Sequence, residues 1–455
     1  VGALTMSGPW SNGTLAGTGM LDLQSGSMTN MTLNVPGNLV GGRTLILVGL
    51  TLNAQLSVLE GTLQTSTSLD FDGTQTLGGT GTIVLTAGTR KRITTRAAAD
   101  VVTLGPGITL RGGGGQVLIR NLIVRGTVEA MDPFLRVGSA GGTHQNLGTL
   151  RALAGGTLDL NGTWSGGGAI SAAAGSTLEI ESMDLDGQVL ALAGSLETTG
   201  ALGAGTVGGA GQHRVSGGRL RSLVVDAPAV FTSGRSVFLE GLQVDRTLTV
   251  EEAPFTGTTT VTFDGTQTLG GAGTVVFAAG SRKAMNATAG STVTLGSGLT
   301  VRGGGVNVSI LNVINQALIE ATGGGNFSFG SSSTNGTHTG TFRATAGATL
   351  VVRGDWSGSG QVDVAAASVI EADGLDLGGN TLIVDGVLST TSELANVTVA
   401  GTGRYEARGG RLESVVFDVP GKVVSGRTVT VVGMTTNDVF TVEDGPLTGQ
   451  TRITF

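Results

Sequence analysis

The sequence predicts an all-β fold, namely a parallel β-helix (β-solenoid) built on 192-residue super-repeats. Two observations carry this prediction. The segment Phe-Asp-Gly-Thr-Gln-Thr-Leu-Gly-Gly occurs at 71–79 and again at 263–271. Short stretches in which apolar and polar residues alternate, each bounded by glycine, fill the rest of the chain. Alternation with a period of two residues is the pattern of a half-buried strand.

The 192-residue step, which we call the repeat period, recurs at other landmarks and sets the expected domain boundaries. The landmarks are Trp164 and Trp356, Pro36, Pro228 and Pro420, and Arg43, Arg235 and Arg427. We expect residues 1–71 to be the C-terminal part of one repeat, and residues 72–263 and 264–455 to be two full repeats. Because both ends fall inside a repeat, we expect the chain to be part of something longer or a processed product.

Most of the chain is expected to form short strands. In segments such as 156–162, 176–181 and 291–296, Leu, Ile or Val alternates with Thr, Asp or Glu. Helical periodicity is nearly absent, and residues 89–104 are expected to be an irregular excursion. Sandwiches and propellers usually anchor each unit with large aromatic rings, whereas aromatic residues are only 4% here. A solenoid with three strands per turn fits better, with about eight or nine turns per repeat.

Composition argues against several classes of protein. Glycine accounts for 81 of the 455 residues, yet no Gly-X-Y period runs through the chain, which excludes collagen. Hydrophobic residues are 39% and charged residues 13%, the opposite balance to a disordered chain. There is no cysteine, so disulfides and thiolate metal sites are excluded. The net charge of −7 is thinly spread and no long apolar run occurs, so we expect neither nucleic-acid binding nor membrane insertion.

Two acidic groups recur at the repeat period and are candidates for chemistry. They are Glu179, Glu181 and Asp184 with Glu371, Asp373 and Asp376, and Glu251 and Glu252 with Glu443 and Asp444. Alternate strand positions place Glu179 and Glu181 on one outward face. There, carboxylates could hold Ca²⁺ or act as acid and base on a polysaccharide. The simpler interpretations, which we adopt, are a solvated strand face for the first group and an exposed turn for the second.

Basic residues form two groups. One is Arg90, Lys91, Arg92 and Arg96, of which Arg282 and Lys283 persist in the second copy, and the other is Arg43, Arg235 and Arg427. The first group could bind an acidic glycan, although a solvated loop is the simpler interpretation. In the second group, each arginine follows glycine at a turn, and we expect its guanidinium to bind the carbonyls of that corner. A contact to a neighbouring chain is the alternative.

The three histidines, His144, His213 and His338, give no catalytic pattern. His144 and His338 are expected to correspond, because each ends a Gly-Thr-His segment. Neither has a second histidine or a carboxylate near it in sequence, which argues against a Ser/His/Asp group. The sequence therefore predicts no catalytic residue, no cofactor and no metal site.

Several glycine-rich segments carry a resemblance to a known class of proteins. They are 10–19, 77–85, 164–168 and 356–360. These segments resemble the Gly/Thr-rich repeats of giant bacterial surface proteins, including autotransporter passengers and filamentous haemagglutinin-like adhesins. The resemblance implies a right-handed parallel β-helix, export to the cell surface, and adhesion or coat formation, but no catalytic residue carries over. The long repeat period departs from many such passengers, which repeat turn by turn.

We therefore expect a structural extracellular protein rather than an enzyme. Its role would be to form part of a long surface fibre, stalk or coat, with adhesion or self-assembly as its task. Expected partners are further copies of the chain, end to end or side by side, and glycans or a surface. The alternative is a carbohydrate-active β-helix enzyme of the lyase or glycosidase type. Ice binding ranks last, because threonine pairs such as Thr260 and Thr262 recur only once per period.

Overall fold

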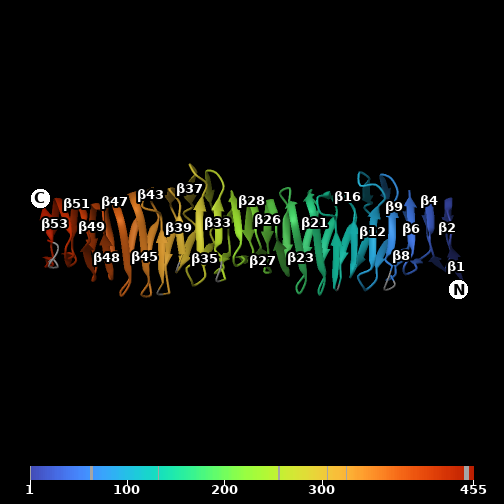
Figure 1. The fold of residues 1–455 in the computed structure, drawn as a ribbon, viewed down its shortest axis with the longest axis horizontal. Coiled ribbons are helices and arrows are strands. Elements are labelled where there is room, and N and C mark those ends of the chain that lie inside the picture. The colour runs from blue at the N-terminus through green and yellow to red at the C-terminus, as the bar shows by residue number, and fades with distance from the viewer. Residues whose placement is uncertain are drawn as a thin grey trace. The chain divides into compact units, whose positions relative to one another are not determined.

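The computed structural model describes residues 2–61, 65–131, 133–254, 257–304, 306–323, 325–444 and 450–455. These residues form 55 strands and no helix (Figure 1). The strands pair in parallel and wind into a β-solenoid of about 22 turns, which confirms the predicted fold class. The handedness and the repeat boundaries remain predictions. By its internal contacts the chain divides into unit 1, Val1–Pro228, and unit 2, Ala229–Phe455.

Unit 1 consists of three parallel sheets, and the chain visits them in turn. Sheet 1 contains β1 (Ala3–Met6), β3 (Met20–Leu23), β5 (Gly37–Leu39), β8 (Gln55–Val58), β11 (Thr82–Leu85), β14 (Thr109–Gly112), β17 (Thr127–Ala130), β20 (Thr149–Ala152), β22 (Ala169–Ala172), β24 (Val189–Leu192) and the ends of β26 (Ala201–Gly208) and β28 (Gly218–Asp226). Sheet 2 contains the starts of β2 (Trp10–Leu15), β4 (Gly26–Leu33), β21 (Thr157–Ser165) and β23 (Thr177–Asp184), with β6 (Thr44–Val48), β9 (Thr67–Phe71), β12 (Lys91–Thr95), β15 (Gly115–Leu118), β18 (Phe134–Val137), β25 (Ser195–Thr198) and β27 (Gln212–Val215). Sheet 3 contains the ends of β2, β4, β21 and β23 and the starts of β26 and β28, with β7 (Thr51–Leu52), β10 (Gln75–Leu77), β13 (Val101–Leu104), β16 (Asn121–Val124) and β19 (Thr143–Asn146).

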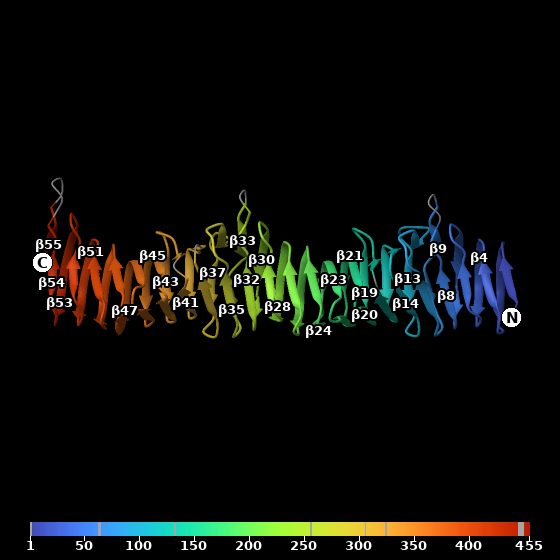
Figure 2. The same cartoon turned by 90° about the horizontal axis from the view of Figure 1, so that it is seen from below.

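Unit 2 is built in the same way, as Figure 2 shows from a second direction. Sheet 4 contains β29 (Ala229–Phe231), β32 (Thr247–Val250), β35 (Thr274–Phe277), β38 (Thr300–Gly303), β41 (Leu318–Ala321), β44 (Thr341–Ala344), β46 (Gln361–Val364) and the ends of β47 (Val369–Val384), β49 (Glu393–Ala400), β51 (Gly410–Phe417) and β53 (Thr428–Thr436). Sheet 5 contains β30 (Ser236–Glu240), β33 (Thr259–Phe263), β36 (Lys283–Ala287), β39 (Val306–Ser309), β42 (Asn326–Phe329), the starts of β45 (Thr349–Gly358) and β47, β48 (Val387–Thr390), β50 (Arg404–Ala407), β52 (Gly421–Val423) and β54 (Phe440–Val442). Sheet 6 contains β31 (Gln243–Val244), β34 (Gln267–Leu269), β37 (Thr292–Leu295), β40 (Asn312–Asn315), β43 (Asn335–His338), the end of β45, the middle of β47, the starts of β49, β51 and β53, and β55 (Arg452–Thr454).

The alternating sequence places one row of side chains in the core and the next on the surface. In β11, Ile83 and Leu85 are buried, while Thr82 and Val84, which alternate with them, are partly exposed. Burying an aliphatic side chain of this size contributes roughly 1.5–3 kcal/mol. Each turn covers the core residues of the turn before it, so the apolar interior is continuous along each unit.

Residues one repeat period apart do not lie on the same sheet. Within unit 1, the start of β4 belongs to sheet 2, whereas the start of β28, its counterpart one period later, belongs to sheet 3. Likewise β3 belongs to sheet 1 and its counterpart β27 to sheet 2. The sequence period is therefore one strand longer than a whole number of turns. Where the step of 192 holds, as in the pairs 144 with 164 and 336 with 356, it preserves the residue that each residue faces on the next turn. It does not preserve the sheet, as β3 and β4 show.

One corner of the solenoid is made by single residues in the left-handed conformation. Asn12 and Asn30 have φ of 55° and 52°, and the Asn30 Nδ2 donates to the Asn12 Oδ1 at 3.2 Å. Ala204 and Ser222 occupy the same positions one repeat period later, with φ of 52° and 47°. Asparagine tolerates this conformation better than alanine or serine. The corner is thus imposed by the stacking of the turns rather than by local preference.

The stretch 89–104 differs from its prediction. It holds two strands, β12 and β13, joined by a turn in which the Asp100 amide donates to the Ala97 carbonyl at 3.2 Å. The consecutive alanines Ala97, Ala98 and Ala99 lie in this turn. In the part of the chain that the structure describes, no helix is long and apolar enough to span a bilayer.

Candidate functional site

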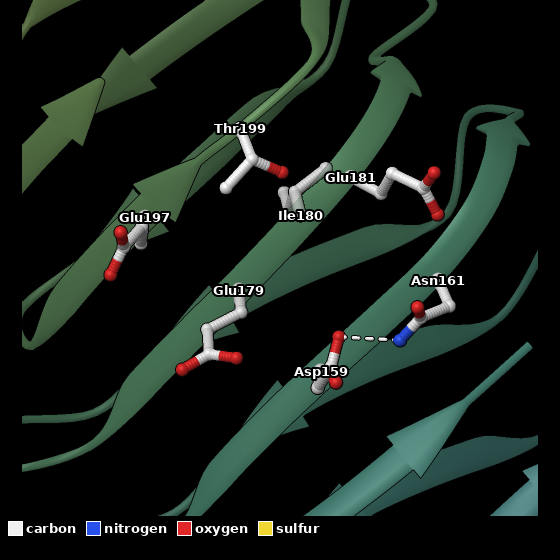
Figure 3. Close-up of a pocket in the computed structure, with 7 residues that line it drawn as sticks. All are labelled: Asp159, Asn161, Glu179, Ile180, Glu181, Glu197 and Thr199. Atoms are coloured by element: carbon white, nitrogen blue, oxygen red, sulfur yellow. Dashed lines mark hydrogen bonds between the residues drawn. The ribbon is translucent and has the colours of Figure 1, made fainter. Parts of the chain in front are cut away.

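A shallow hollow lies on the outer face of sheet 2 in unit 1. It has a volume of about 380 Å³ and is lined by Asp159, Asn161, Glu179, Ile180, Glu181, Glu197 and Thr199 (Figure 3). Asp159 on β21, Glu179 on β23 and Glu197 on β25 are register partners on three successive strands. They therefore stand in a single column, which we call the acidic column, about 4.8 Å apart from strand to strand.

The acidic column ends in an arginine at each side. The register places Arg136 next to Asp159 and Arg214 next to Glu197. The Arg136 Nε donates to the Asp159 Oδ2 at 2.8 Å, and the Ser216 hydroxyl donates to Glu197 at 2.8 Å. Asp159 and Glu197, the two outer carboxylates of the acidic column, therefore each accept a hydrogen bond from a neighbouring side chain.

Glu179, at the centre of the column, has neither a hydrogen bond nor an ion pair with any described residue. Partial burial raises its pKa above the ordinary value, and the negative charges of Asp159 and Glu197 raise the pKa further. Arg136 opposes this effect but does not cancel it. Because like charges on neighbouring strands repel, Glu179 holds its proton more strongly than an ordinary glutamate.

The three carboxylates that the sequence grouped do not converge. Glu181 turns away from Glu179 and accepts a hydrogen bond from the Gly162 amide at 2.6 Å (Figure 3). Asp184 is exposed and caps its own turn, with its Oδ1 accepting from the Asp186 amide at 2.9 Å. Throughout the described ranges, no group of three or more Asp, Glu or His side chains is placed to hold a metal ion.

The counterpart in unit 2 is not an acidic column. Glu371 pairs in register with Ser389, and the Arg408 Nη1 donates to Glu371 at 2.8 Å. Asp373 repeats the role of Glu181, because it accepts from the Gly354 amide at 2.8 Å. Asp376 accepts from the Asn396 side chain at 2.9 Å. Of the six repeated carboxylates, all but Glu179 thus have structural partners, and the unrepeated neighbours Asp159 and Glu197 make the surroundings of Glu179 acidic.

Comparison with known proteins adds no relative. No protein-family model, no curated protein and no solved structure matches this chain.

The basic group of residues 90–96 is not a free cluster for an anion. The side chain of Lys91 is 0% exposed, and its Nζ lies 2.5 Å from the Glu60 carboxylate and 2.7 Å from the Gly88 carbonyl. Lys283 in unit 2 is equally buried and binds Glu252 and the Gly280 carbonyl. The interpretation of Lys91 as part of a solvated loop is therefore wrong, because its buried ammonium group binds both the Glu60 carboxylate and the Gly88 carbonyl.

Glu252 is likewise not simply an exposed turn residue. Its carboxylate binds the Lys283 ammonium and accepts hydrogen bonds from the Arg282 amide at 3.0 and 3.2 Å. Partial burial would raise the pKa of Glu252, but the hydrogen bonds from Lys283 and Arg282 outweigh it and hold the pKa below the ordinary value. Glu60 is held in the same way by Lys91 and the Arg90 amide. Sequence inspection missed Glu60, although it stands one repeat period before Glu252.

The strongest sequence motif serves to join neighbouring turns. The Gln75 Oε1 accepts from the Gly49 amide at 2.8 Å, and its Nε2 donates to the Leu47 and Asp72 carbonyls at 2.8 and 3.0 Å. Gln267 makes the same three contacts in unit 2, at 2.8, 2.7 and 3.0 Å. The recurring segment is therefore explained by structure and not by a ligand.

The recurring arginines at turns do not behave as predicted. Arg43, Arg235 and Arg427 are exposed, and no guanidinium contact is present for them in the described structure. Their backbones hold the corner instead: the carbonyls of the three arginines accept from amides of the following turn at 2.8–2.9 Å. Side-chain capping is not needed, because the backbone groups are already paired.

The three histidines are buried in the core, and none of them lines the hollow. His144 and His338 do not correspond as the Gly-Thr-His segments indicated. His144 pairs with Trp164, whereas the residue that pairs with Trp356 is Gly336, and His338 lies two residues further along its strand. The pairing of strands sets the correspondence, and the local tripeptide does not.

Proposed function

We propose that this chain is a structural segment of an extracellular surface repeat protein, part of a long fibre, stalk or coat that serves adhesion or self-assembly. The observation that carries the proposal is the use of the repeated glutamines. Gln75 and Gln267 each bind three backbone groups and so join two successive turns within their unit. A sequence repeated for a ligand would place its repeated polar groups outward and leave them unpaired.

Charged side chains support the same proposal, because they also join turns. In sheet 1, Arg111 and Arg151 flank Glu129, with an Arg111–Glu129 distance of 2.9 Å and a hydrogen bond from the Arg151 Nε at 2.8 Å. Glu129 is only 3% exposed. Bonds of this kind between charged groups are stronger than neutral hydrogen bonds. They resist separation of the turns along the axis, which is the demand placed on a fibre.

Self-assembly and adhesion are tested on the purified chain. We expect negative-stain electron microscopy at rising protein concentration to show end-to-end or lateral association, and a glycan array or a coated surface to retain the chain. Dispersed single particles at every concentration, together with no retention on any glycan or surface, would contradict the proposal.

A carbohydrate-active enzyme is the second candidate, and the acidic column favours it. Glu179 has a raised pKa beside Asp159, which Arg136 contacts. A carboxyl group that holds its proton more strongly than usual, next to a second carboxyl group, is what an acid acting on a glycosidic bond requires. Release of reducing ends from polysaccharides, abolished by Glu179→Gln and retained in Glu371→Gln, would replace the structural proposal by this one.

A further inference from the structure

Two histidines are sealed in the core on corresponding strands of the two units. His144 lies in β19 of unit 1 and His338 in β43 of unit 2, and both residues are 0% exposed. A fully buried imidazole stays neutral in the folded state, and it takes up a proton only when its strand becomes exposed to water.

The surroundings of His144 suit only the neutral ring. The Nδ1 accepts from the Leu122 amide of β16 at 3.4 Å, and the ring packs on Trp164 of β21 with centroids 4.6 Å apart. The Nε2 is buried without a hydrogen bond of normal geometry. Burial lowers the pKa of His144, and the Ser139 backbone carbonyl opposes this only in part. Three glycines enclose the Nε2 so closely that a Cβ on Gly138, Gly142 or Gly162 would lie 2.7–2.8 Å away.

His338 is enclosed in a different way but with the same result. Its Nδ1 lies 3.1 Å from the Asn315 Nδ2 of β40, and its Nε2 lies 3.1 Å from the Gln361 carbonyl of β46. The amide can only donate and the carbonyl can only accept, so the neutral ring carries its proton on Nε2. Phe342 of β44 stacks on the ring at 3.8 Å, and Trp356 of β45 meets it edge-on.

Neither imidazole has a charged neighbour that would stabilise a proton. The ring of His144 contacts β16, β21 and the turn 138–142. The ring of His338 contacts β40, β44, β45 and β46. Within the described residues, these contacts are backbone groups, an amide and aromatic rings, with no Asp, Glu, Lys or Arg side chain. Protonation therefore becomes favourable only after the strand leaves the core.

We propose that β19 in unit 1 and β43 in unit 2 are acid-sensitive turns, which open when the imidazoles of His144 and His338 take up a proton. Burial lowers the pKa of each histidine to about 4, from 6.5 when it is free in water. Between these two values the opened strand binds a proton and the closed strand does not. At pH 5 the opening constant of each strand is expected to be about 30-fold higher than at pH 7.5.

Hydrogen exchange followed by mass spectrometry on the whole chain tests this proposal. Exchange is measured at pH 7.5 and 5.0 and corrected for the known pH dependence of the chemical step. Peptides that cover 134–165 and 326–358 are compared with peptides that cover 82–112 and 274–303, which contain no histidine. We expect the increase of about 30-fold in the first pair and less than about 3-fold in the second.

Two variants separate the histidines from other acid effects. His338→Asn introduces the residue that unit 1 carries at the matching position, Asn146, and His144→Gln keeps a polar side chain that does not titrate. Each variant is expected to remove the increase from its own peptide only. An unchanged increase in both variants, or equal increases in all four wild-type peptides, overturns the proposal. If a variant fails to fold, NMR titration of the wild-type imidazoles decides, because folded-state titration near pH 6.5 would also overturn it.

Discussion

Loss of the carboxylate that binds a buried lysine is expected to destabilise unit 1 more than loss of the lysine itself. The Lys91 side chain is 0% exposed, whereas the Glu60 side chain is 36% exposed. Glu60→Ala leaves an ammonium group inside the protein with two carbonyl acceptors and no counter-charge. Removing one partner of a buried ion pair in this way costs about 3–5 kcal/mol.

The opposite change leaves a group that water can reach. In Lys91→Met, an unbranched apolar side chain fills most of the space of the lysine stem. Glu60 keeps its hydrogen bonds from the Arg90 amide and gains hydration on its exposed side. We expect a loss of roughly 1.5–3 kcal/mol, the usual contribution of a hydrogen bond to a charged group. The double variant Glu60→Gln, Lys91→Met is expected to lie within about 1 kcal/mol of Lys91→Met alone.

Native-state hydrogen exchange of peptides spanning β9 and β12 measures these free energies locally. The pair Glu252 and Lys283 in unit 2 offers an independent test, because loss of Glu252 should again destabilise more than loss of Lys283. This difference is measured in peptides spanning β33 and β36. If Glu60→Ala is no more destabilising than Lys91→Met in unit 1, and the unit 2 pair agrees, the account of Lys91 as a buried cation that depends on its counter-charge is refuted.

Four further changes follow from the contacts described above. Gly79→Ala should destabilise by at least about 2 kcal/mol, because φ is 101° and the new Cβ would lie 2.1 Å from the Leu52 carbonyl. Gln75→Leu leaves one backbone amide and two backbone carbonyls without their side-chain partner. It should lower the free energy of unfolding in urea by about 2 kcal/mol. The pKa of Glu179 lies above its ordinary 4.5, so protonated Glu179 stabilises the fold below pH 4.5, and this contribution is lost as pH rises through the raised pKa. The free energy of unfolding gained by Glu179→Gln over the wild type should therefore be larger at pH 7 than at pH 4. His213, with its pKa lowered to about 4, costs stability as pH falls from 6.5 towards 4, by about 2 kcal/mol at pH 5, and His213→Tyr should remove that loss.

Each of these four changes has a control in unit 2. Gly271→Ala and Gln267→Leu repeat the first two and should cost the same within about 1 kcal/mol. Glu371→Gln should bring no gain at pH 7, because Arg408 already neutralises that carboxylate. Tyr405 shows that tyrosine fits the position of His213, since its hydroxyl bonds Thr390 at 2.6 Å as His213 bonds Thr198 at 2.9 Å. A gain in Glu371→Gln equal to that in Glu179→Gln would show that the acidic column is not its cause.

The candidate site was only partly visible in the sequence. Glu179 and Glu181 were placed on one face by strand alternation, and this was correct for their backbone positions. Asp159 and Glu197 were missed, because the residues that meet Glu179 are one turn away and belong to no local motif. Turn length also varies along the chain, since Leu196 pairs with His213 but Gln75 pairs with the much more distant Val102. Without knowing each turn length, no spacing rule could assemble the column.

The same limit explains the error over the histidines. Gly-Thr-His reads as one motif in both copies, but the register with Trp164 and Trp356 shifts it by two residues. A shift of two keeps a side chain on the same face of a strand, so the alternating pattern stayed intact and gave no warning.

Local pattern alone determined that this chain forms short parallel strands around an apolar core, because alternation and glycine corners act over a few residues. Tertiary structure alone decided which residues meet across turns. It placed the buried ammonium of Lys91 on Glu60 and the acidic column on one unit only. Within unit 1 it also placed β27 and β28 on different sheets from β3 and β4, their counterparts one repeat period earlier. The physical reason is that contacts in a solenoid join residues one turn apart, and the length of each turn is set by how the chain packs rather than by any local signal.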